Sequence, residues 1–158
     1  PDILVLGKGM GGGMPIGAFT ASEALMKLLS FEPKLGHITT FGGNPVIASA
    51  ALATLKELTE SNIIEDTLEK EKLFRKLLKH PLIKEIRGKG LMLAILFDKP
   101  EITSEIILKS KDKGLLLFWL LFESKAIRIT PPLTISTTEI EEGCEIFMSV
   151  LSSIKFNK

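Results

Sequence analysis

The chain has little cysteine, no long hydrophobic run and almost no net charge. Cys144 is its only cysteine, so an internal disulfide is excluded and a reducing cytosol is favoured. The longest nearly uninterrupted apolar run, Leu115 to Phe122, is too short to span a bilayer, which takes about 20 residues. No signal peptide is visible. These absences predict a cytoplasmic protein that has no membrane partner.

The charges are balanced and interspersed. Lysine and arginine number 20 and the acids 19, which leaves a formal net charge of +1. This balance argues against nucleic acid or an anionic membrane as the main partner. With 45% hydrophobic and 25% charged residues, the 158-residue chain can build a core, as one ordinary domain or two small ones.

A glycine-rich stretch, GKGMGGGMPIG from Gly7 to Gly17, follows the apolar run Ile3–Leu6, which predicts a buried strand. Lys8 emerges where this strand ends, on backbone that can adopt positive φ and let another molecule come close. A lysine normally extends its amine into water. The stretch therefore indicates either a lysine whose nitrogen is used or a solvated lysine in a glycine-rich turn.

Two phosphate-binding motifs fit this stretch poorly. Residues Gly7 to Gly12 match the G-x-G-x-x-G motif of dinucleotide-binding proteins, but in those proteins a helix begins at this motif. Here the chain runs instead into Ala18–Ala21, which we expect to be a second short strand. A Walker loop needs Ser or Thr after its lysine, whereas Lys8 is followed by glycine.

The string TFGGNP predicts a loop that leads into a helix. Asn44 is a strong N-cap residue and Pro45 is favoured at the first helical position, so a helix should run from Pro45 to about residue 59. We expect unpaired amides at this junction, with the hydroxyls of Thr39 and Thr40 just upstream. Such a place can hold an anion, although a purely structural turn is the other interpretation. His37 is interpreted as a packing or capping residue.

Arg128 lies in the string AIRITPPLTIS, where it alternates with Ile127 and Ile129. On a strand it would therefore point to the side opposite to these two residues. The residues alone leave its role open between a structural arginine on an exposed sheet face and an anion-binding group.

The rest of the chain predicts further α/β structure. Residues 83–97 read as two strand pieces, the second fully apolar and buried. A helix over 102–113, strands over 115–119 and 126–130, and a helix from about Thr137 with Ser136 or Thr137 as its cap should follow. The charged run Glu69–Lys72 is interpreted as a solvated face. Because the pattern changes near Ser61, we place a domain boundary between residues 1–61 and 62–158.

The string PDILVLGKGMGGGMPIGAF closely resembles the segment around the cofactor lysine in class III pyridoxal-phosphate-dependent aminotransferases, and TFGGNP and IRGKGLM resemble later segments in the same order. The resemblance covers nearly the whole chain but well under half of a family member. It implies that residues 1–61 end the large cofactor-binding domain, which is incomplete here, and that 62–158 form the small C-terminal domain.

The resemblance also implies the roles of four residues. The lysine that matches Lys8 forms an internal Schiff base with pyridoxal 5'-phosphate and later moves a proton. The threonine that matches Thr40 reaches the cofactor phosphate of the neighbouring subunit of a homodimer, and Thr39 matches the residue beside it. The arginine that matches Arg128 pairs with a substrate carboxylate through two parallel hydrogen bonds. We assign no metal ligand.

The activity so implied is that of a transferase of amino-acid metabolism, with amino-acid and keto-acid substrates. It would move an amino group from an acetylornithine-like or ornithine-like amino acid to 2-oxoglutarate. A non-catalytic remnant or interaction module, or a related aminomutase or decarboxylase, are the alternatives. We expect the 158 residues alone to be inactive, because the family's pyridine-binding acid, stacking aromatic and phosphate cup lie upstream.

One segment departs from the family. Many members have a polar loop before the carboxylate-binding arginine, whereas this chain reads FWLLFESK there. Phe118 and Trp119 are expected either to line the substrate pocket or simply to pack.

Overall fold

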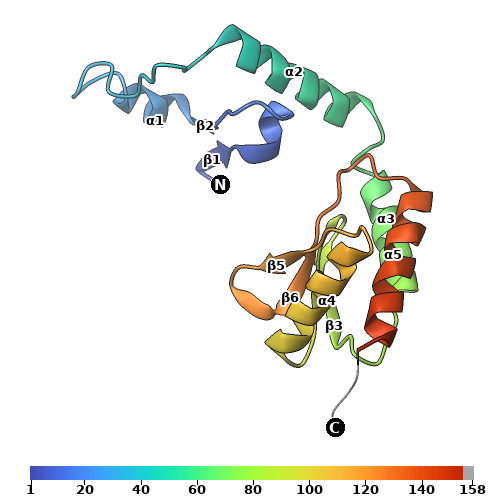
Figure 1. Ribbon diagram of the computed structural model, residues 1–158. Coiled ribbons are helices and arrows are strands. Elements are labelled where there is room, and N and C mark those ends of the chain that lie inside the picture. Colours follow the sequence, from blue (N-terminus) through green and yellow to red (C-terminus); the bar gives the residue numbers. More distant parts are fainter. Residues whose placement is uncertain (155–158) are drawn as a thin grey trace. The chain divides into compact units, whose positions relative to one another are not determined.

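The computed structural model describes residues 1–154 (Figure 1). The chain forms two compact units, Pro1–Asn62 and Ile63–Lys158. Both combine helices with antiparallel strands, so the α/β fold class predicted from the sequence is confirmed. The division falls between residues 62 and 63, and the assignment of the units to a large and a small domain stays a prediction.

The first unit contains a two-stranded ribbon and two helices. Strand β1 (Ile3–Leu6) pairs with β2 (Ala18–Ala21), and a 3-10 turn, η1 (Lys8–Gly11), lies between them. Helix α1 (Glu23–Leu28) is capped by Ser22, whose hydroxyl accepts a hydrogen bond from the Leu25 amide at 3.4 Å, and α2 spans Pro45–Glu60.

The prediction that β1 is a buried strand is wrong for the described chain. All four residues of β1 are exposed, and Val5 is 74% exposed. Within the described residues, β1 pairs with β2 alone and forms part of a two-stranded ribbon. Apolar sequence thus identifies the strand correctly but does not reveal what covers it.

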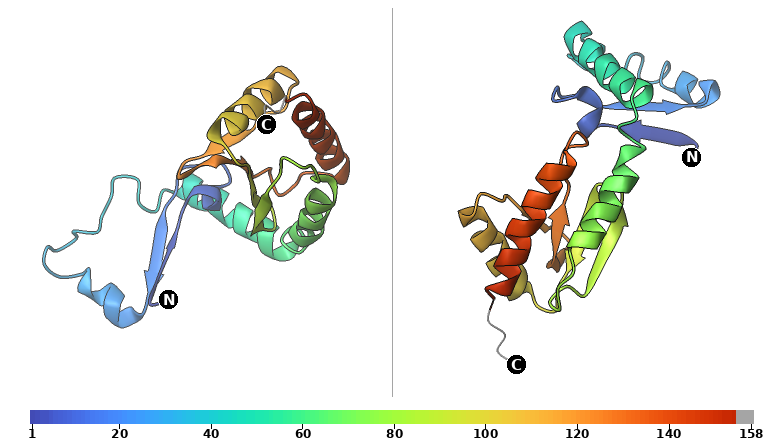
Figure 2. Two further views of the ribbon diagram at one scale, coloured as in Figure 1. Left: turned by 90° about the horizontal axis from the view of Figure 1, so that it is seen from below. Right: turned by 90° about the vertical axis from the view of Figure 1, so that its right-hand side faces the viewer.

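The second unit is built on a four-stranded antiparallel sheet in the order β3-β4-β6-β5. Its strands are β3 (Glu85–Lys89), β4 (Met92–Leu96), β5 (Phe118–Leu120) and β6 (Glu123–Ile129). Its helices are α3 (Asp66–Leu77), α4 (Pro100–Asp112) and α5 (Thr137–Ser152), and α3 and α5 lie side by side (Figures 1 and 2). Helix α4 begins two residues before its predicted start because Pro100 occupies the favoured first position.

The core of this unit lies between the three helices and one face of the sheet. Its fully buried members come from β4, β6, α4 and α5, and include Ile95, Ile127, Ile106, Ile140 and Val150. The expectation that the second apolar piece is buried throughout is therefore half right. Met92 of β4 is 73% exposed, because alternate residues of β4 point to the sheet face away from the helices.

The charged run Glu69–Lys72 is only partly solvated, which corrects its interpretation as a free surface. The Glu71 side chain is 16% exposed and accepts hydrogen bonds from Arg75 Nε at 2.8 Å and the Gly90 amide at 2.5 Å. Arg75 also donates to the Ile86 carbonyl at 2.6 Å. These bonds join α3 to the β3–β4 hairpin.

Strand β5 is shorter than predicted and begins three residues later. Its predicted start, Leu115, instead follows the end of α4, where its amide donates to the Ser110 carbonyl at 2.9 Å. Leu115 and Leu117 pack against the core, which draws this segment away from the sheet. Strand β6 conversely begins at Glu123, earlier than predicted.

Candidate functional site

Lys8 follows β1 directly and adopts a left-handed backbone conformation, with φ of 50°. A residue other than glycine costs roughly 1–3 kcal/mol in this region, and such residues cluster at functional sites. Its side chain is exposed, and it takes part in no hydrogen bond or ion pair among residues 1–154. Among the lysines of residues 1–154, the positive φ distinguishes Lys8.

The glycines after Lys8 seat its loop on the first unit itself. A side chain at Gly11 would bring its Cβ within 2.9 Å of Ile16 Cγ2, and one at Gly12 would collide with Thr54 of α2. Gly12 also has a φ of 57°. The expectation that this backbone lets another molecule come close is therefore wrong at Gly11 and Gly12, because residues of the same unit already lie against the backbone there. A Cβ at Gly9 would meet nothing within 4 Å.

The TFGGNP turn is more fully hydrogen-bonded than predicted. Asn44 Oδ1 accepts from the amides of Val46 and Ile47 at 3.0 and 3.3 Å, and the Gly42 amide donates to the Thr39 carbonyl at 3.1 Å. The expectation of unpaired amides at the start of α2 is therefore wrong for these groups. Asn44, the correctly predicted cap, takes the donors that an anion would have used.

A small cavity of about 240 Å³ joins this turn to the end of the Lys8 loop. It is lined by Pro15, Ile16 and Gly17 on one side, and by Thr39 and the start of α2 on the other. The hydroxyls of Thr39 and Thr40 lie on exposed residues and have no hydrogen-bond partner within residues 1–154. The first unit thus places Thr39 on the cavity that the end of the Lys8 loop also lines, whereas Thr40 is not among the lining residues.

Arg128 lies on β6 in the second unit, where it is paired with Ala94 of β4 and Phe118 of β5. Its guanidinium carbon lies 5.3 Å from the centre of the Phe118 ring. Ile127 and Ile129 point to the opposite side and belong to the core or its margin, as the alternating sequence predicts. Arg128 makes no ion pair within the described chain, so its charge is available to an anion.

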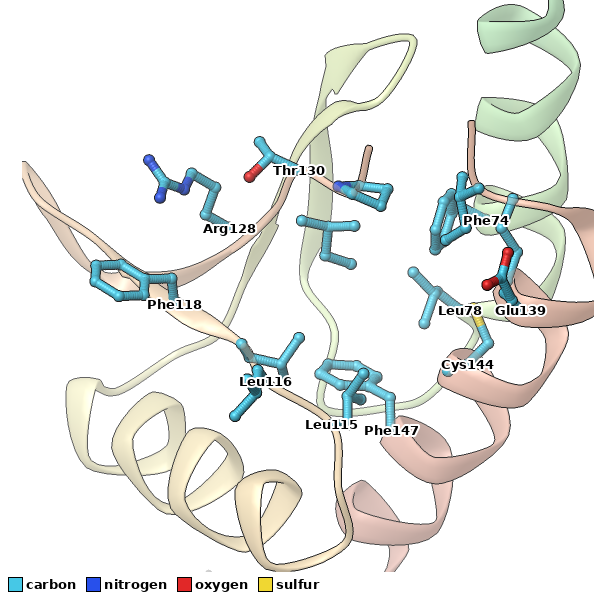
Figure 3. Close-up of a pocket in the computed structure, with 16 residues that line it drawn as sticks. Phe74, Leu78, Leu115, Leu116, Phe118, Arg128, Thr130, Glu139, Cys144 and Phe147 are labelled. Atoms are coloured by element: carbon cyan, nitrogen blue, oxygen red, sulfur yellow. The ribbon is translucent and has the colours of Figure 1, made fainter. Parts of the chain in front are cut away.

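A cavity of about 190 Å³ lies beside Arg128, between the diverging ends of β5 and β6 and helix α5. Figure 3 shows Arg128 and Phe118 at one end of this cavity and Cys144 with Leu78 at the other. The guanidinium group points away from the cavity centre, so the cavity is an apolar space beside the arginine. Burial raises the pKa of the Cys144 thiol to about 11, which keeps it protonated.

His37, which the sequence interprets as a packing or capping residue, has a structural partner: its Nδ1 lies 3.0 Å from the Leu29 carbonyl. Arg87 pairs with Glu85 at 2.8 Å. Sequence reasoning missed the Arg128–Phe118 contact, although it named both residues. Residues 1–154 contain no cluster of three or more side chains suited to a metal ion, and none of their helices is long and apolar enough to cross a membrane.

The family model Aminotransferase class-III matches residues 1–151. The chain belongs to this family. It is 44% identical over 161 residues to an acetylornithine aminotransferase of Caldanaerobacter subterraneus subsp. tengcongensis, and the match covers 99% of this chain but 39% of the relative. It is 46% identical over 143 residues to a putrescine aminotransferase of Pectobacterium atrosepticum, a match that covers 86% of this chain and 30% of the relative.

Solved structures agree with this assignment. An acetylornithine aminotransferase from Elizabethkingia anophelis superposes with a TM-score of 0.83 at 34% identity, over 98% of this chain and 39% of that one. The ornithine δ-aminotransferase of Plasmodium falciparum gives a TM-score of 0.80 at 34% identity, over 96% and 40%. The chain therefore has the fold of a part of these enzymes, about two fifths of their length.

Proposed function

We propose that the complete protein is a pyridoxal-phosphate-dependent aminotransferase that acts on an acetylornithine-like or ornithine-like amino acid, with 2-oxoglutarate as acceptor. The observation that carries this proposal is Lys8, a strained lysine with an unpaired amine, placed after β1 in the segment that resembles the family's cofactor site. The 44% identity to an acetylornithine aminotransferase supports the substrate class.

The residues of the first unit fit pyridoxal phosphate. Lys8 would hold its aldehyde carbon covalently, because its amine is exposed and has no competing partner within the described chain. Thr40, with Thr39 beside it, would offer a hydroxyl to the phosphate across the interface of a homodimer. When bound, the cofactor supplies an electron sink, and the protein supplies orientation and charge.

Lys8 has a second task in this proposal, which is to move a proton to and from the substrate carbon. The close approach of Gly12 to Thr54 of α2, and of Gly11 to Ile16 in the loop itself, keeps the backbone under this amine in place.

Arg128 would bind the substrate carboxylate. Its planar guanidinium can donate two parallel hydrogen bonds to one carboxylate, which fixes the carboxylate in orientation as well as in position. Arg128 forms no ion pair within residues 1–154, and this supports the role because a paired carboxylate of the protein would compete with the substrate.

A second candidate donor is a diamine, since a putrescine aminotransferase is 46% identical over 143 residues. The two candidates differ at Arg128. An amino-acid donor and 2-oxoglutarate both carry carboxylates, whereas a diamine carries none. Arg128→Ala should therefore raise KM for donor and acceptor in the first case and for the acceptor alone in the second.

The test uses the complete protein loaded with pyridoxal phosphate. Acetylornithine, ornithine and putrescine are each offered with 2-oxoglutarate, and glutamate formation is measured. We expect glutamate to form when an amino acid is the donor, and we expect Lys8→Ala to form none. A loaded protein that forms no glutamate from any amine would contradict the proposal and favour the non-catalytic remnant. Amine rearrangement or CO2 release without glutamate would favour the aminomutase or decarboxylase.

Cytoplasmic location and homodimer formation belong to the same proposal, and gel filtration tests homodimer formation.

A further inference from the structure

Phe118 and Arg128 are directly opposite each other in the register of β5 and β6. Directly paired residues of an antiparallel ladder point to the same face of the sheet, so the ring and the guanidinium share the face turned away from the helices. The guanidinium carbon lies 5.3 Å from the ring centre, within the range of a cation–π contact. Figure 3 shows the two side chains next to each other.

The Phe118 ring is itself held in place. The ring of Trp119 meets it edge-on, with centroids 6.3 Å apart and planes at 75°. Trp119 Nε1 donates a hydrogen bond to Ser104 Oγ of α4 at 3.3 Å, which ties this edge strand to the helix layer. The register shifts immediately after Trp119, so the pair Phe118–Arg128 precedes the point where the regular ladder breaks.

An aromatic face restrains a guanidinium without using its hydrogen-bond donors. The other cross-strand neighbour of Arg128 is Ala94, which is uncharged, and Arg128 has no ion pair within the described residues. Arg87 provides the contrast: it is paired with Ala94 from the other side, but its charge is compensated by Glu85 at 2.8 Å. Of these two arginines, Arg128 keeps its N–H groups available, and only Arg128 stacks on a ring.

We propose that Phe118 is a positioning residue for carboxylate binding: its ring holds the Arg128 guanidinium in the orientation in which it receives the substrate carboxylate. The inference rests on the proposed function for the role of Arg128 in carboxylate binding. The contact between Phe118 and Arg128 does not depend on that function. A guanidinium that is already oriented loses less freedom when the carboxylate binds, so Phe118 should lower KM for carboxylate substrates.

The test compares Phe118→Leu, which keeps an apolar side chain of similar bulk but removes the ring, with Phe118→Tyr, which keeps it. In the complete, loaded protein, Phe118→Leu should raise KM for 2-oxoglutarate roughly two- to fivefold, the size of an exposed cation–π contact, with kcat little changed. Phe118→Tyr should keep the wild-type KM.

Phe122→Ala is the matched control. The Phe122 ring lies at the tip of the hairpin and is fully exposed, so this variant should leave KM unchanged. A Phe118→Leu enzyme with wild-type KM, or equal losses in Leu and Tyr variants, would overturn the inference.

A spectroscopic measurement separates this inference from the proposed function. The ring current of Phe118 should shift the NMR signals of the Arg128 side chain, which are assigned by their disappearance in Arg128→Lys. Phe118→Leu should abolish that shift whether or not the protein turns over any amine. If the shift is present and no transamination occurs, the proposed function fails and with it the role of Arg128. If transamination occurs without the shift, the positioning role of Phe118 fails alone.

Discussion

The backbone amide of Gly90 donates a hydrogen bond to Glu71 Oε2 at 2.5 Å, and this bond joins helix α3 to the turn between β3 and β4. The hydrogen bond from Arg75 to Glu71, followed by that from Gly90, lowers the pKa of the Glu71 carboxyl below its usual 4.5. A carboxyl with a lowered folded-state pKa stabilises the fold above its unfolded pKa, and this contribution is lost as the pH falls through the folded-state value.

Glu71→Gln should therefore destabilise the second unit at pH 7 by about 1–2 kcal/mol. It should also remove the fall in the free energy of unfolding that the wild type shows between about pH 5 and the folded-state pKa of Glu71. Denaturation followed by the fluorescence of Trp119, the only tryptophan, reports on this unit. Glu69→Gln is the control, because Glu69 pairs with Lys72 in solvent and should change stability little. Equal effects of the two variants would contradict the structural role of Glu71.

Two hydroxyls of α4, on Thr103 and Ser110, are fully buried and have no hydrogen-bond partner in the described structure. A buried polar group without a partner costs free energy, so Thr103→Val and Ser110→Ala should leave stability unchanged or raise it by up to about 1 kcal/mol. The same fluorescence assay measures this. A loss of more than 1 kcal/mol in both variants would mean that these hydroxyls have partners in solution.

Gly12 is expected to be intolerant of substitution. Gly12→Ala forces a side chain into a left-handed conformation, which costs about 1–2 kcal/mol, and drives its Cβ into Thr54. The Lys8 loop should then lift from α2, and the complete protein should lose bound pyridoxal phosphate and activity. Gly9→Ala is the matched variant, since a Cβ there meets nothing within 4 Å and should be tolerated. Retention of cofactor absorbance in Gly12→Ala would show that this seating is unimportant.

Cys144 should be unreactive in the folded protein. Its thiol is buried in the core, and its pKa of about 11 leaves very little thiolate at neutral pH. Alkylation by iodoacetamide at pH 7.5 should proceed only after denaturation. Rapid labelling of the folded protein would show that the cavity beside Arg128 opens to solvent as far as its inner end.

Local signals predicted much of the fold. Asn44 caps α2 as expected, and Ser136, rather than Thr137, caps α5 in a capping box with Glu139. These predictions succeed because a cap and its helix depend on residues three positions apart. The family motifs also lie in short contiguous strings, so Lys8, Thr39, Thr40 and Arg128 can be proposed from the sequence as site residues, and their roles stay predictions.

The predictions that failed have two kinds of cause. The amides of Val46 and Ile47 are paired by the Asn44 side chain, which is a local consequence of the predicted N-cap that the expectation of unpaired amides left out. The other failures depend on distant residues. The pairing of Phe118 with Arg128 depends on a strand that starts later than its apolar letters suggest and on a register shift after Trp119. The register of a strand pair and the burial of a strand face depend on tertiary contacts, which the periodicity of apolar residues does not encode.

The covalent link between Lys8 and pyridoxal phosphate, on which the proposed function depends, can be trapped chemically. The complete protein, loaded with pyridoxal phosphate, is reduced with borohydride, digested and analysed by mass spectrometry. We predict the mass of a reduced phosphopyridoxyl group on Lys8 and its absence in Lys8→Arg. An adduct on another lysine, or none in a protein that retains bound cofactor, would contradict the account.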